Sequence, residues 1–229
     1  MTSLRGFLAS LVLGVAAAIV IVALSIVPFL NPVSVGFEQD RAQAQAWTGW
    51  TTQELRTVTD AILADLILGP PAFDVALDGT PVLDVRERQH MADVRSVFAS
   101  FYLVAAGAAL LLAVAFAVSR GARARAVLWR RLSTAGLWIA LITVVGGAAG
   151  ILFFDQAFEL FHTLFFPAGS YNFDPGTERL VQLFPYQFWV ETTIAVGTLV
   201  VALSLLLWLF GRRRAAANAA EASDAVGAA

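Results

Sequence analysis

The sequence contains no cysteine, no lysine and only two histidines among its 229 residues. Without cysteine, the chain has no disulfide, no thiolate metal site and no cysteine nucleophile. Charged residues make up only 14% of it, whereas an ordinary soluble domain has about a quarter. The net charge of −2 argues against nucleic acid as a partner, because nucleic acid attracts basic proteins.

Several catalytic motifs are missing as well. The chain has no Gly-x-Ser-x-Gly elbow, no phosphate-binding Walker loop and no His-Glu-x-x-His zinc motif. Its longest apolar runs carry no charged residue near their middle, which argues against the ion or proton pathway of a transporter.

Hydrophobic residues, by contrast, make up 59% of the chain. They form four runs near the length of about 20 residues that a helix needs to cross a bilayer. The first run is too long for the apolar region of a signal peptide and lacks a small-residue cleavage site, so we expect it to be retained. We therefore predict an all-α membrane protein with four transmembrane helices. The predicted spans are residues 7–30, 97–118, 134–154 and 192–210.

The placement of arginine predicts the direction of these spans. Five arginines and no acid lie between the second and third spans, three arginines follow the fourth, and Arg5 precedes the first. By the positive-inside rule these segments are cytoplasmic, and so are both termini. Fourteen of the seventeen acids fall within residues 31–96 and 155–190, which we expect outside the membrane on the extracytoplasmic face.

These boundaries divide the chain into a four-helix membrane domain, residues 1–214, and a tail, residues 215–229. The tail is rich in alanine and low in complexity, so we expect it to be disordered and cytoplasmic. The membrane domain carries a small extracytoplasmic cap at residues 31–96 and an aromatic outer loop at residues 155–190.

The cap is too long for a simple turn and carries signals of its own structure. Thr51 and Glu54 have capping-box spacing, and apolar residues at helical spacing follow them up to Gly69-Pro70-Pro71. This pattern predicts a short amphipathic helix. Further along, Asp78-Gly79 predicts the turn of a β-hairpin whose returning strand is Val82-Leu83.

The aromatic outer loop is dominated by phenylalanine. Residues 153–189 hold nine Phe, two Tyr and one Trp, which is twelve of the 26 aromatic residues of the chain. An interfacial belt is one interpretation, but belts favour Trp and Tyr. A pocket that receives acyl chains is the other, and the two interpretations are about equally supported.

The two histidines are the main candidates for chemistry. His90 lies about seven residues before the second span, and His162 lies about eight residues after the third. If both segments continue their helices outward, each histidine lies about 10–12 Å beyond the hydrocarbon. A lone interfacial histidine is usually only solvated, but two at one depth point to a shared site. Histidine can take or give a proton near neutral pH.

Each histidine follows a glutamate by three residues, Glu87 before His90 and Glu159 before His162, so each pair shares a helix face. Such a carboxylate can orient an imidazole and raise its basicity. Asp93 is a further candidate near His90, and these acids favour His90 as the base, although the two roles stay open.

The same Glu-x-x-His spacing also occurs in helical di-metal sites, which need further acids from other helices. Here the first and fourth spans offer no core acid except Glu191 near one end. A bound metal is therefore the less favoured alternative.

Three sequence elements together resemble a family of bacterial integral membrane proteins that includes the lipoprotein intramolecular transacylases. They cover nearly the whole chain except the tail, and each falls at the matching topological place. The family pattern has a lysine where this chain has Arg95 and a tryptophan near Tyr171, which suggests a divergent branch. The elements are Glu87-x-x-His90-Met91-x-Asp93-Val94-Arg95, Phe161-His162-x-x-Phe165-Phe166 and Asn172-Phe173-Asp174-Pro175.

The resemblance implies an enzyme of the bacterial cell membrane, an acyltransferase. It would move the sn-2 acyl chain of a diacylglyceryl-cysteine lipoprotein to the cysteine α-amino group, giving a lyso-form lipoprotein. His90 and His162 would be its catalytic residues, acting without a metal or other cofactor. Its partners would be diacylated bacterial lipoproteins and membrane lipids, and no nucleic acid.

The resemblance and the spacing also name further site residues. The expected supporting or orienting residues are Glu87, Asp93, Arg95 and Glu159. The expected substrate pocket consists of Met91, Phe158, Phe161, Phe165, Phe166, Tyr171, Phe173 and Asp174.

The alternative is a non-enzymatic membrane protein whose outer cap binds a lipid or a partner protein. In that case the histidines only satisfy local hydrogen bonds, and the acylation of lipoprotein N-termini does not depend on the protein.

Overall fold

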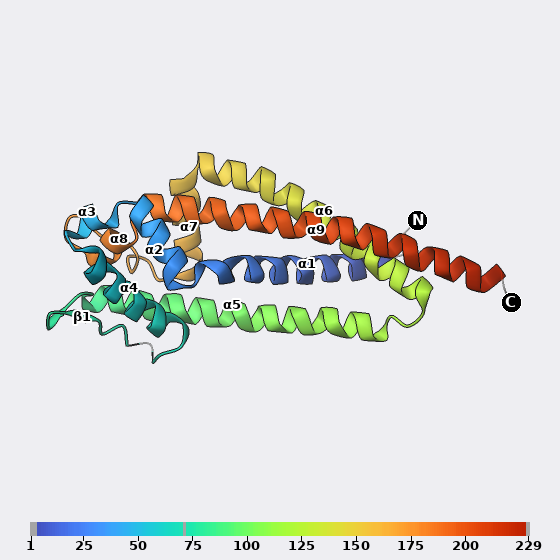
Figure 1. The fold of residues 1–229 in the computed structure, drawn as a ribbon, viewed down its shortest axis with the longest axis horizontal. Helices are drawn as coiled ribbons and strands as arrows, with labels where there is room; N and C mark the ends of the chain where they lie inside the picture. Colours follow the sequence, from blue (N-terminus) through green and yellow to red (C-terminus); the bar gives the residue numbers. More distant parts are fainter. Residues whose placement is uncertain (1–3, 71, 228–229) are drawn as a thin grey trace. The chain divides into compact units, whose positions relative to one another are not determined.

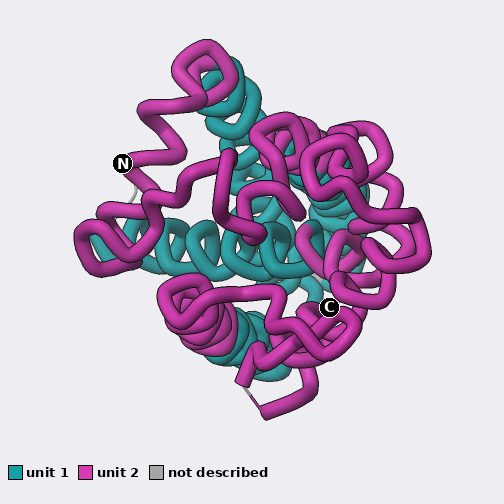
Figure 2. Tube along the Cα trace, turned by 90° about the vertical axis from the view of Figure 1, so that its left-hand side faces the viewer, with its two compact units in different colours: residues 1–25, 101–148, 196–229 teal, residues 26–100, 149–195 magenta. Residues whose placement is uncertain are grey.

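The computed structural model describes residues 4–70 and 72–227, which fall into two compact units (Figure 1, Figure 2). Unit 1 comprises residues 1–25, 101–148 and 196–229, and unit 2 comprises residues 26–100 and 149–195. Pro71, the last residue of the predicted helix stop, and the last two residues of the predicted tail lie outside the described residues.

Unit 1 is built from long apolar helices. They are α1 (Leu4–Ile26), the second half of α5 (Val85–Val118), most of α6 (Ala122–Leu152) and most of α9 (Tyr186–Gly227). Each of the four helices contains an apolar stretch long enough to cross a bilayer. The prediction of four spans is confirmed, and the chain is a multi-pass membrane protein. Within unit 1, the start of α1, the α5–α6 turn and the end of α9 lie at the same end (Figure 1).

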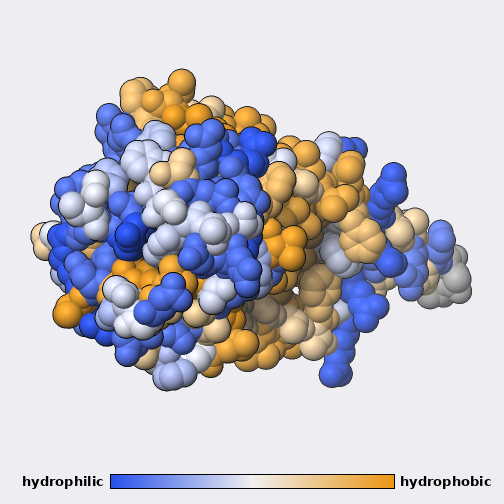
Figure 3. Space-filling view, turned by 60° about the vertical axis from the view of Figure 1, so that its left-hand side comes forward, coloured by the Kyte–Doolittle hydropathy of each residue, from blue (hydrophilic) through white to orange (hydrophobic). Residues whose placement is uncertain are grey.

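The outward side chains of unit 1 are apolar, because lipid takes the place of water around them. Leu103, Val118 and Ile142 are each exposed by about two-thirds or more. Figure 3 shows such side chains as a largely orange surface over the long helices. Between helices, small residues allow close approach: a Cβ at Gly136 in α6 would lie 2.6 Å from the Ser204 carbonyl oxygen in α9.

Unit 2 contains the cap and the aromatic outer loop. Thr51 caps the main cap helix: the Glu54 N–H donates to Thr51 Oγ1 at 3.3 Å, and the Thr51 N–H donates to the Glu54 carboxylate at 2.7 Å. The predicted capping box and amphipathic helix are therefore confirmed. Unit 2 also includes the first half of α5. The helices that lie wholly within unit 2 are η1 (Val27–Phe29), α2 (Pro32–Arg41), α3 (Ala44–Thr48), α4 (Thr52–Ile67), α7 (Phe154–Phe165) and α8 (Arg179–Leu183).

The apolar face of α4 forms the core of the cap. Leu55, Val58 and Ile62 are almost completely buried, and they pack with Phe73 and with Leu183 of α8. Because α8 belongs to the aromatic outer loop, this core joins the two outer segments into one body.

The predicted hairpin is present but shorter than expected. Strands β1 (Ala76–Leu77) and β2 (Thr80–Pro81) pair antiparallel around Asp78-Gly79, both of which have positive φ. The pair Val82-Leu83, expected as the returning strand, instead lies buried in the cap core. One further backbone hydrogen bond follows this short ladder, from the Val82 N–H to the Val75 carbonyl at 2.9 Å.

Two helices differ from their predicted bounds. The last span was expected to end near residue 210 and to be followed by a disordered tail, but α9 continues to Gly227. Alanine has the highest helix propensity, and the tail is rich in it. At the other end of the third span, Phe153 (φ −124°, ψ 45°) separates α6 from α7. His162 therefore lies on a separate helix, not on a continuation of the third span.

Candidate active site

His90 lies on the outer end of α5, before the part of the helix that spans the bilayer. At 34 residues α5 is about 50 Å long, well beyond the hydrocarbon thickness of about 30 Å, so its charged first turns lie outside the bilayer core. The helix begins with a reciprocal cap. The Glu87 N–H donates to Asp84 Oδ1 at 2.8 Å, and the Asp84 N–H donates to Glu87 Oε2 at 2.7 Å. This cap places His90 on the second turn.

Glu87 is a buried link between α5 and α8. Its Oε1 accepts a hydrogen bond from the Leu180 N–H at 2.6 Å, and only 2% of the residue is exposed. Burial raises the pKa of this carboxyl, although the two backbone N–H groups act against that. The sequence predicts that Glu87 orients His90. In the structure the hydrogen bonds of Glu87 go to backbone N–H groups, so its effect on His90 is through the position of α5.

His162 lies on α7, and a hydrogen bond within that helix sets its tautomer. Its Nδ1 lies 2.7 Å from the Phe158 carbonyl oxygen. A carbonyl only accepts hydrogen bonds, so Nδ1 carries the proton in the neutral ring and Nε2 keeps its lone pair. The side chain is nine-tenths buried. His162 therefore presents a proton acceptor with a defined direction.

The rings of His90 and His162 lie close together. Their ring centroids are 6.0 Å apart and their planes differ by 22°. The Phe166 ring contacts both, at 4.8 Å from His90 and 5.4 Å from His162. His90 is 6% exposed and His162 is 8% exposed, so the pair is shielded from water. The structure thus brings together the two residues that the sequence singled out from different segments.

Burial and charge keep His90 neutral. Desolvation is the larger cause and the charge of His162 the smaller one, and together they lower the pKa of His90 to about 4, while Asp93 acts in the opposite direction. His90 Nδ1 is buried and has no hydrogen-bond partner within residues 4–70 and 72–227. A buried ring nitrogen without a partner is costly, and such a group is available to a ligand.

Aromatic rings surround the pair. Phe158 lies 4.1 Å, Tyr171 5.0 Å and Phe161 5.4 Å from the His162 ring, centroid to centroid. Phe173 lies 5.4 Å from the His90 ring. Phe165 packs against Phe161, with ring centroids 4.9 Å apart and planes tilted by 43°, and it is half exposed, so it lies at the edge of this cluster.

The remaining predicted residues lie elsewhere. Met91 packs into the cap core, and Asp174 forms a turn in which its Oδ1 accepts the Gly176 N–H at 2.8 Å. The Arg95 guanidinium donates to the Asp65 carbonyl at the end of α4. Glu159 is exposed and accepts the Tyr171 hydroxyl at 2.9 Å. Of these residues, only Glu159 reaches the histidine cluster, through Tyr171.

The sequence profile described as lipoprotein intramolecular transacylase Lit matches residues 11–189, which include both histidines and most of the chain. The chain belongs to this family. Membership in the Lit family makes it an acyltransferase of the membrane. Among curated protein sequences, none matches the chain significantly.

Solved structures of Lit from Bacillus cereus have the same fold. One shares 21% identity and a TM-score of 0.70 with this chain, covering 90% of this chain and 94% of the other. A variant with one histidine replaced by arginine has 17% identity, a TM-score of 0.69 and 93% coverage of both chains. A variant with one histidine replaced by alanine has 18% identity and a TM-score of 0.66, covering 90% and 91%.

Arg86 is a residue of this Lit family member that the sequence reasoning did not single out. Its guanidinium donates to the Asn172 carbonyl at 2.9 Å, pairs with Glu178, and lies 4.9 Å above the Phe173 ring. It thereby holds the aromatic outer loop against α5 beside His90. The available signal was a cation one residue before Glu87, but sequence alone does not reveal a partner some 90 residues away.

The acids of the two Glu-x-x-His motifs do not gather around a common point. Glu87 bonds backbone N–H groups, and Glu159 bonds the Tyr171 hydroxyl. In the part of the chain that the structure describes, no group of three or more His, Asp or Glu residues is arranged to hold a metal ion.

Proposed function

We propose that this Lit family member moves the sn-2 acyl chain of a diacylglyceryl-cysteine lipoprotein to the cysteine α-amino group, with His90 and His162 as the catalytic pair. The observation that carries the proposal is the buried contact between these two rings inside an aromatic cluster. The product is a lyso-form lipoprotein.

His162 acts as the base in this proposal. Its Nδ1–H is held by the Phe158 carbonyl, so Nε2 faces the substrate with a free lone pair. The α-ammonium group of the substrate has a pKa of about 8, and it loses one proton to solvent before attack. As the amine nitrogen bonds the ester carbonyl carbon, Nε2 takes a second proton from it. The acids near His90 in the sequence favoured His90 as the base. We assign the base to His162 instead, because the carboxylate of Glu87 bonds backbone N–H groups and not His90.

His90 acts as a neutral hydrogen-bond donor. With a pKa near 4, His90 carries no charge at neutral pH. It therefore donates a hydrogen bond through a ring N–H while the ring stays neutral. The developing oxyanion of the tetrahedral intermediate is the group that such a donor stabilises best. When the bond from carbonyl carbon to glyceryl oxygen breaks, protonated His162 returns its proton to that oxygen. The products are an amide and a glyceryl hydroxyl, with one proton released overall.

The surroundings of the pair suit this substrate. Phenylalanine rings accept acyl chains, and the exclusion of water protects the acyl group from hydrolysis. Amine and ester belong to one molecule, so holding them close supplies much of the rate enhancement. Glu159 and Tyr171 support the position of the His162 side of the cluster, and Arg86 supports the His90 side.

We also place the active site on the extracytoplasmic face of a bacterial cell membrane, with both termini in the cytoplasm. The arginine distribution supports this orientation. In unit 1, the start of α1, the arginine-bearing α5–α6 turn and the end of α9 lie at one end, as that orientation requires (Figure 1).

The test is mass spectrometry of lipoprotein N-termini after incubation of a diacylated lipoprotein with the purified full-length protein in vesicles. We expect His162→Ala and His90→Ala each to lower transfer by at least about a hundredfold. Thr163→Ala, an exposed neighbour of His162, is the matched control and should keep wild-type transfer. Full activity in either histidine variant contradicts the catalytic pair. An unchanged acylation pattern with the wild-type protein favours the non-enzymatic binding role.

A further inference from the structure

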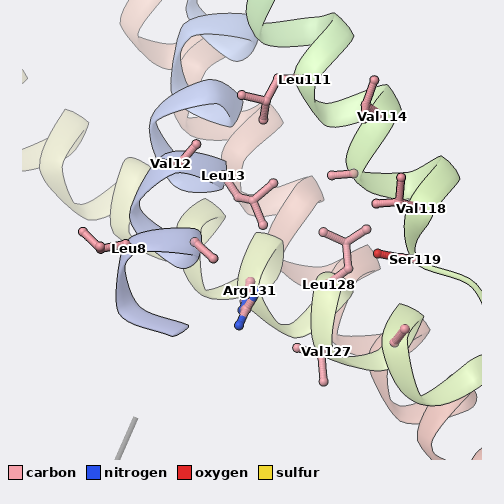
Figure 4. Close-up of a pocket in the computed structure, with 13 residues that line it drawn as sticks. Leu8, Val12, Leu13, Leu111, Val114, Val118, Ser119, Val127, Leu128 and Arg131 are labelled. Carbon is pink, nitrogen blue, oxygen red and sulfur yellow. The ribbon is translucent and has the colours of Figure 1, made fainter. Parts of the chain in front are cut away.

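Unit 1 contains an apolar groove far along the sequence from the histidines. One part has a volume of about 520 Å³ and lies among α1, the end of α5 and the start of α6 (Figure 4). A second hollow of about 400 Å³ continues along α1 and α5 and shares Val12 and Leu111 with the first. The two hollows thus form one continuous groove along the same two helices.

The groove has the length of one leaflet. On α1 its lining extends from Leu8 to Ile19, which is about 17 Å of helix. Half of the hydrocarbon thickness of a bilayer is about 15 Å. A groove of this length that opens at one end of the spans accommodates the acyl chain of a lipid in a single leaflet.

The polar side chains of the lining, Ser119 and Arg131, lie at one end of the groove. Figure 4 shows Arg131 between Leu8 and Val127 and Ser119 beside Val118, both away from Leu111. Arg131 is half-buried, yet it makes no ion pair or hydrogen bond among the described residues. A partly desolvated guanidinium without a partner favours an anion beside it.

The charge of unit 1 reinforces this preference. The unit contains nine of the fifteen arginines but only two acids, Glu221 and Asp224, which follow all of these arginines in the sequence. Arg131 therefore lies in a field that attracts anions. Basic pockets between membrane helices bind the head groups of anionic lipids for this reason.

We propose that the groove binds an anionic phospholipid of the leaflet at the arginine end. One acyl chain lies along α1 and α5, its phosphate pairs with Arg131, and the Ser119 hydroxyl donates a hydrogen bond to the head group. The site is separate from the histidine pair and does not depend on the proposed reaction.

Native mass spectrometry of the full-length protein tests the head-group part of the proposal. The protein is released from detergent with phosphatidylglycerol or with phosphatidylcholine of identical acyl chains. We expect wild type to retain the anionic lipid at least about fivefold better, and Arg131→Gln to lose most of that preference. Arg130→Gln removes the neighbouring exposed arginine outside the groove and should retain it. Equal losses in the two variants, or no preference in wild type, overturn the proposal.

A second variant tests the groove itself. A Cβ at Gly107, which lines the second hollow, would meet no atom within 4 Å, so Gly107→Phe places a ring into the groove from an open position. We expect it to lower retention of both lipids by about fivefold or more. Gly146→Phe is the control, because Gly146 in α6 is equally open but lies outside the groove. Wild-type retention in Gly107→Phe overturns the proposal, whatever the arginine variants show.

Discussion

Unit 1 and unit 2 differ in the polar side chains that they bury. Among the described residues, those of unit 1 are the serines Ser25, Ser133 and Ser204, whereas unit 2 buries larger groups of several kinds. Lipid-facing helices satisfy their own backbone and pack through small residues, so unit 1 has little use for buried polar groups. The buried polar residues of unit 2 are Glu38, Gln39, Thr48, Thr59, Glu87, His90, His162 and Gln182.

Three of these residues, Gln39, Thr59 and Glu87, hold distant segments of unit 2 together. Gln39 Nε2 donates to the Leu183 carbonyl at 3.0 Å, and Glu87 accepts the Leu180 N–H, so α2 and α5 are both tied to α8. The two histidines lie inside this frame. Unit 1 thus consists mainly of membrane-spanning helices, while the polar interior of unit 2 holds the histidine pair to which we assign the chemistry.

The largest expected effect is the removal of one polar link from unit 2. Glu87→Ala leaves the N–H groups of Asp84 and Leu180 without acceptors, at a cost of about 1–3 kcal/mol for each. We expect a loss of about 3–5 kcal/mol in the free energy of unfolding, measured by denaturant titration, and a loss of transfer. Arg88→Ala, on the same turn with an exposed ion pair to Asp74, is the control. A stable Glu87→Ala protein would mean that polar links do not hold unit 2.

The matching change in unit 1 enlarges a small residue. Gly136→Leu drives a side chain into the Ser204 carbonyl of α9, and overpacking of this kind typically costs about 1–3 kcal/mol. Gly146→Leu, at a position where a Cβ would meet no atom within 4 Å, should leave stability almost unchanged. Thermal unfolding of both variants in one lipid mixture measures the difference. Equal unfolding temperatures would argue against close helix packing in unit 1.

A pH dependence is expected from unit 2. The pKa of His90 is about 4 in the fold and about 6.5 in the unfolded chain, so below pH 6.5 the unfolded state binds the proton first. The contribution to stability is intact above pH 6.5 and falls as the pH drops towards 4, by about 2 kcal/mol at about pH 5. His90→Gln should remove this component. The measurement is the difference between the wild-type and variant unfolding curves at several pH values, and identical pH profiles would contradict a buried neutral His90.

The smallest expected effect concerns Arg86, whose exposed side chain holds the aromatic outer loop against α5. Arg86→Ala removes the contacts to Asn172, Glu178 and Phe173, so the ring beside His90 is held less firmly. We expect transfer to fall by about tenfold or less, mainly in kcat, with little change in unfolding temperature. Arg86→Lys keeps the charge but loses the forked geometry, and should recover only part of the rate. Wild-type kcat in Arg86→Ala would show that Arg86 does not position the site.

The features of the chain that are local in sequence were predictable. The four spans follow from run length, α4 follows from Thr51 and Glu54, and the hairpin turn follows from Asp78-Gly79. Each of these signals lies within one helix or one turn. The α-helical tail was missed because low complexity was given more weight than the helix propensity of alanine.

The candidate site was predictable only in part. The sequence indicated His90 and His162 by their rarity and their position next to the spans, but it did not indicate that Glu87 bonds the Leu180 N–H. It also missed Arg86. In both cases the partner comes from residues 172–180, and no periodicity or spacing carries information about a contact over some 90 residues.

The sequence by itself determined that this is a four-span membrane protein with two histidines in the segments that connect its spans, because bilayer thickness and helix rise translate directly into run length. Only the tertiary structure decided that the two rings touch, that Phe158 sets the tautomer of His162, and that burial lowers the pKa of His90. These properties depend on which groups are excluded from water together, and that exclusion arises only when α5, α7 and the aromatic outer loop pack against one another.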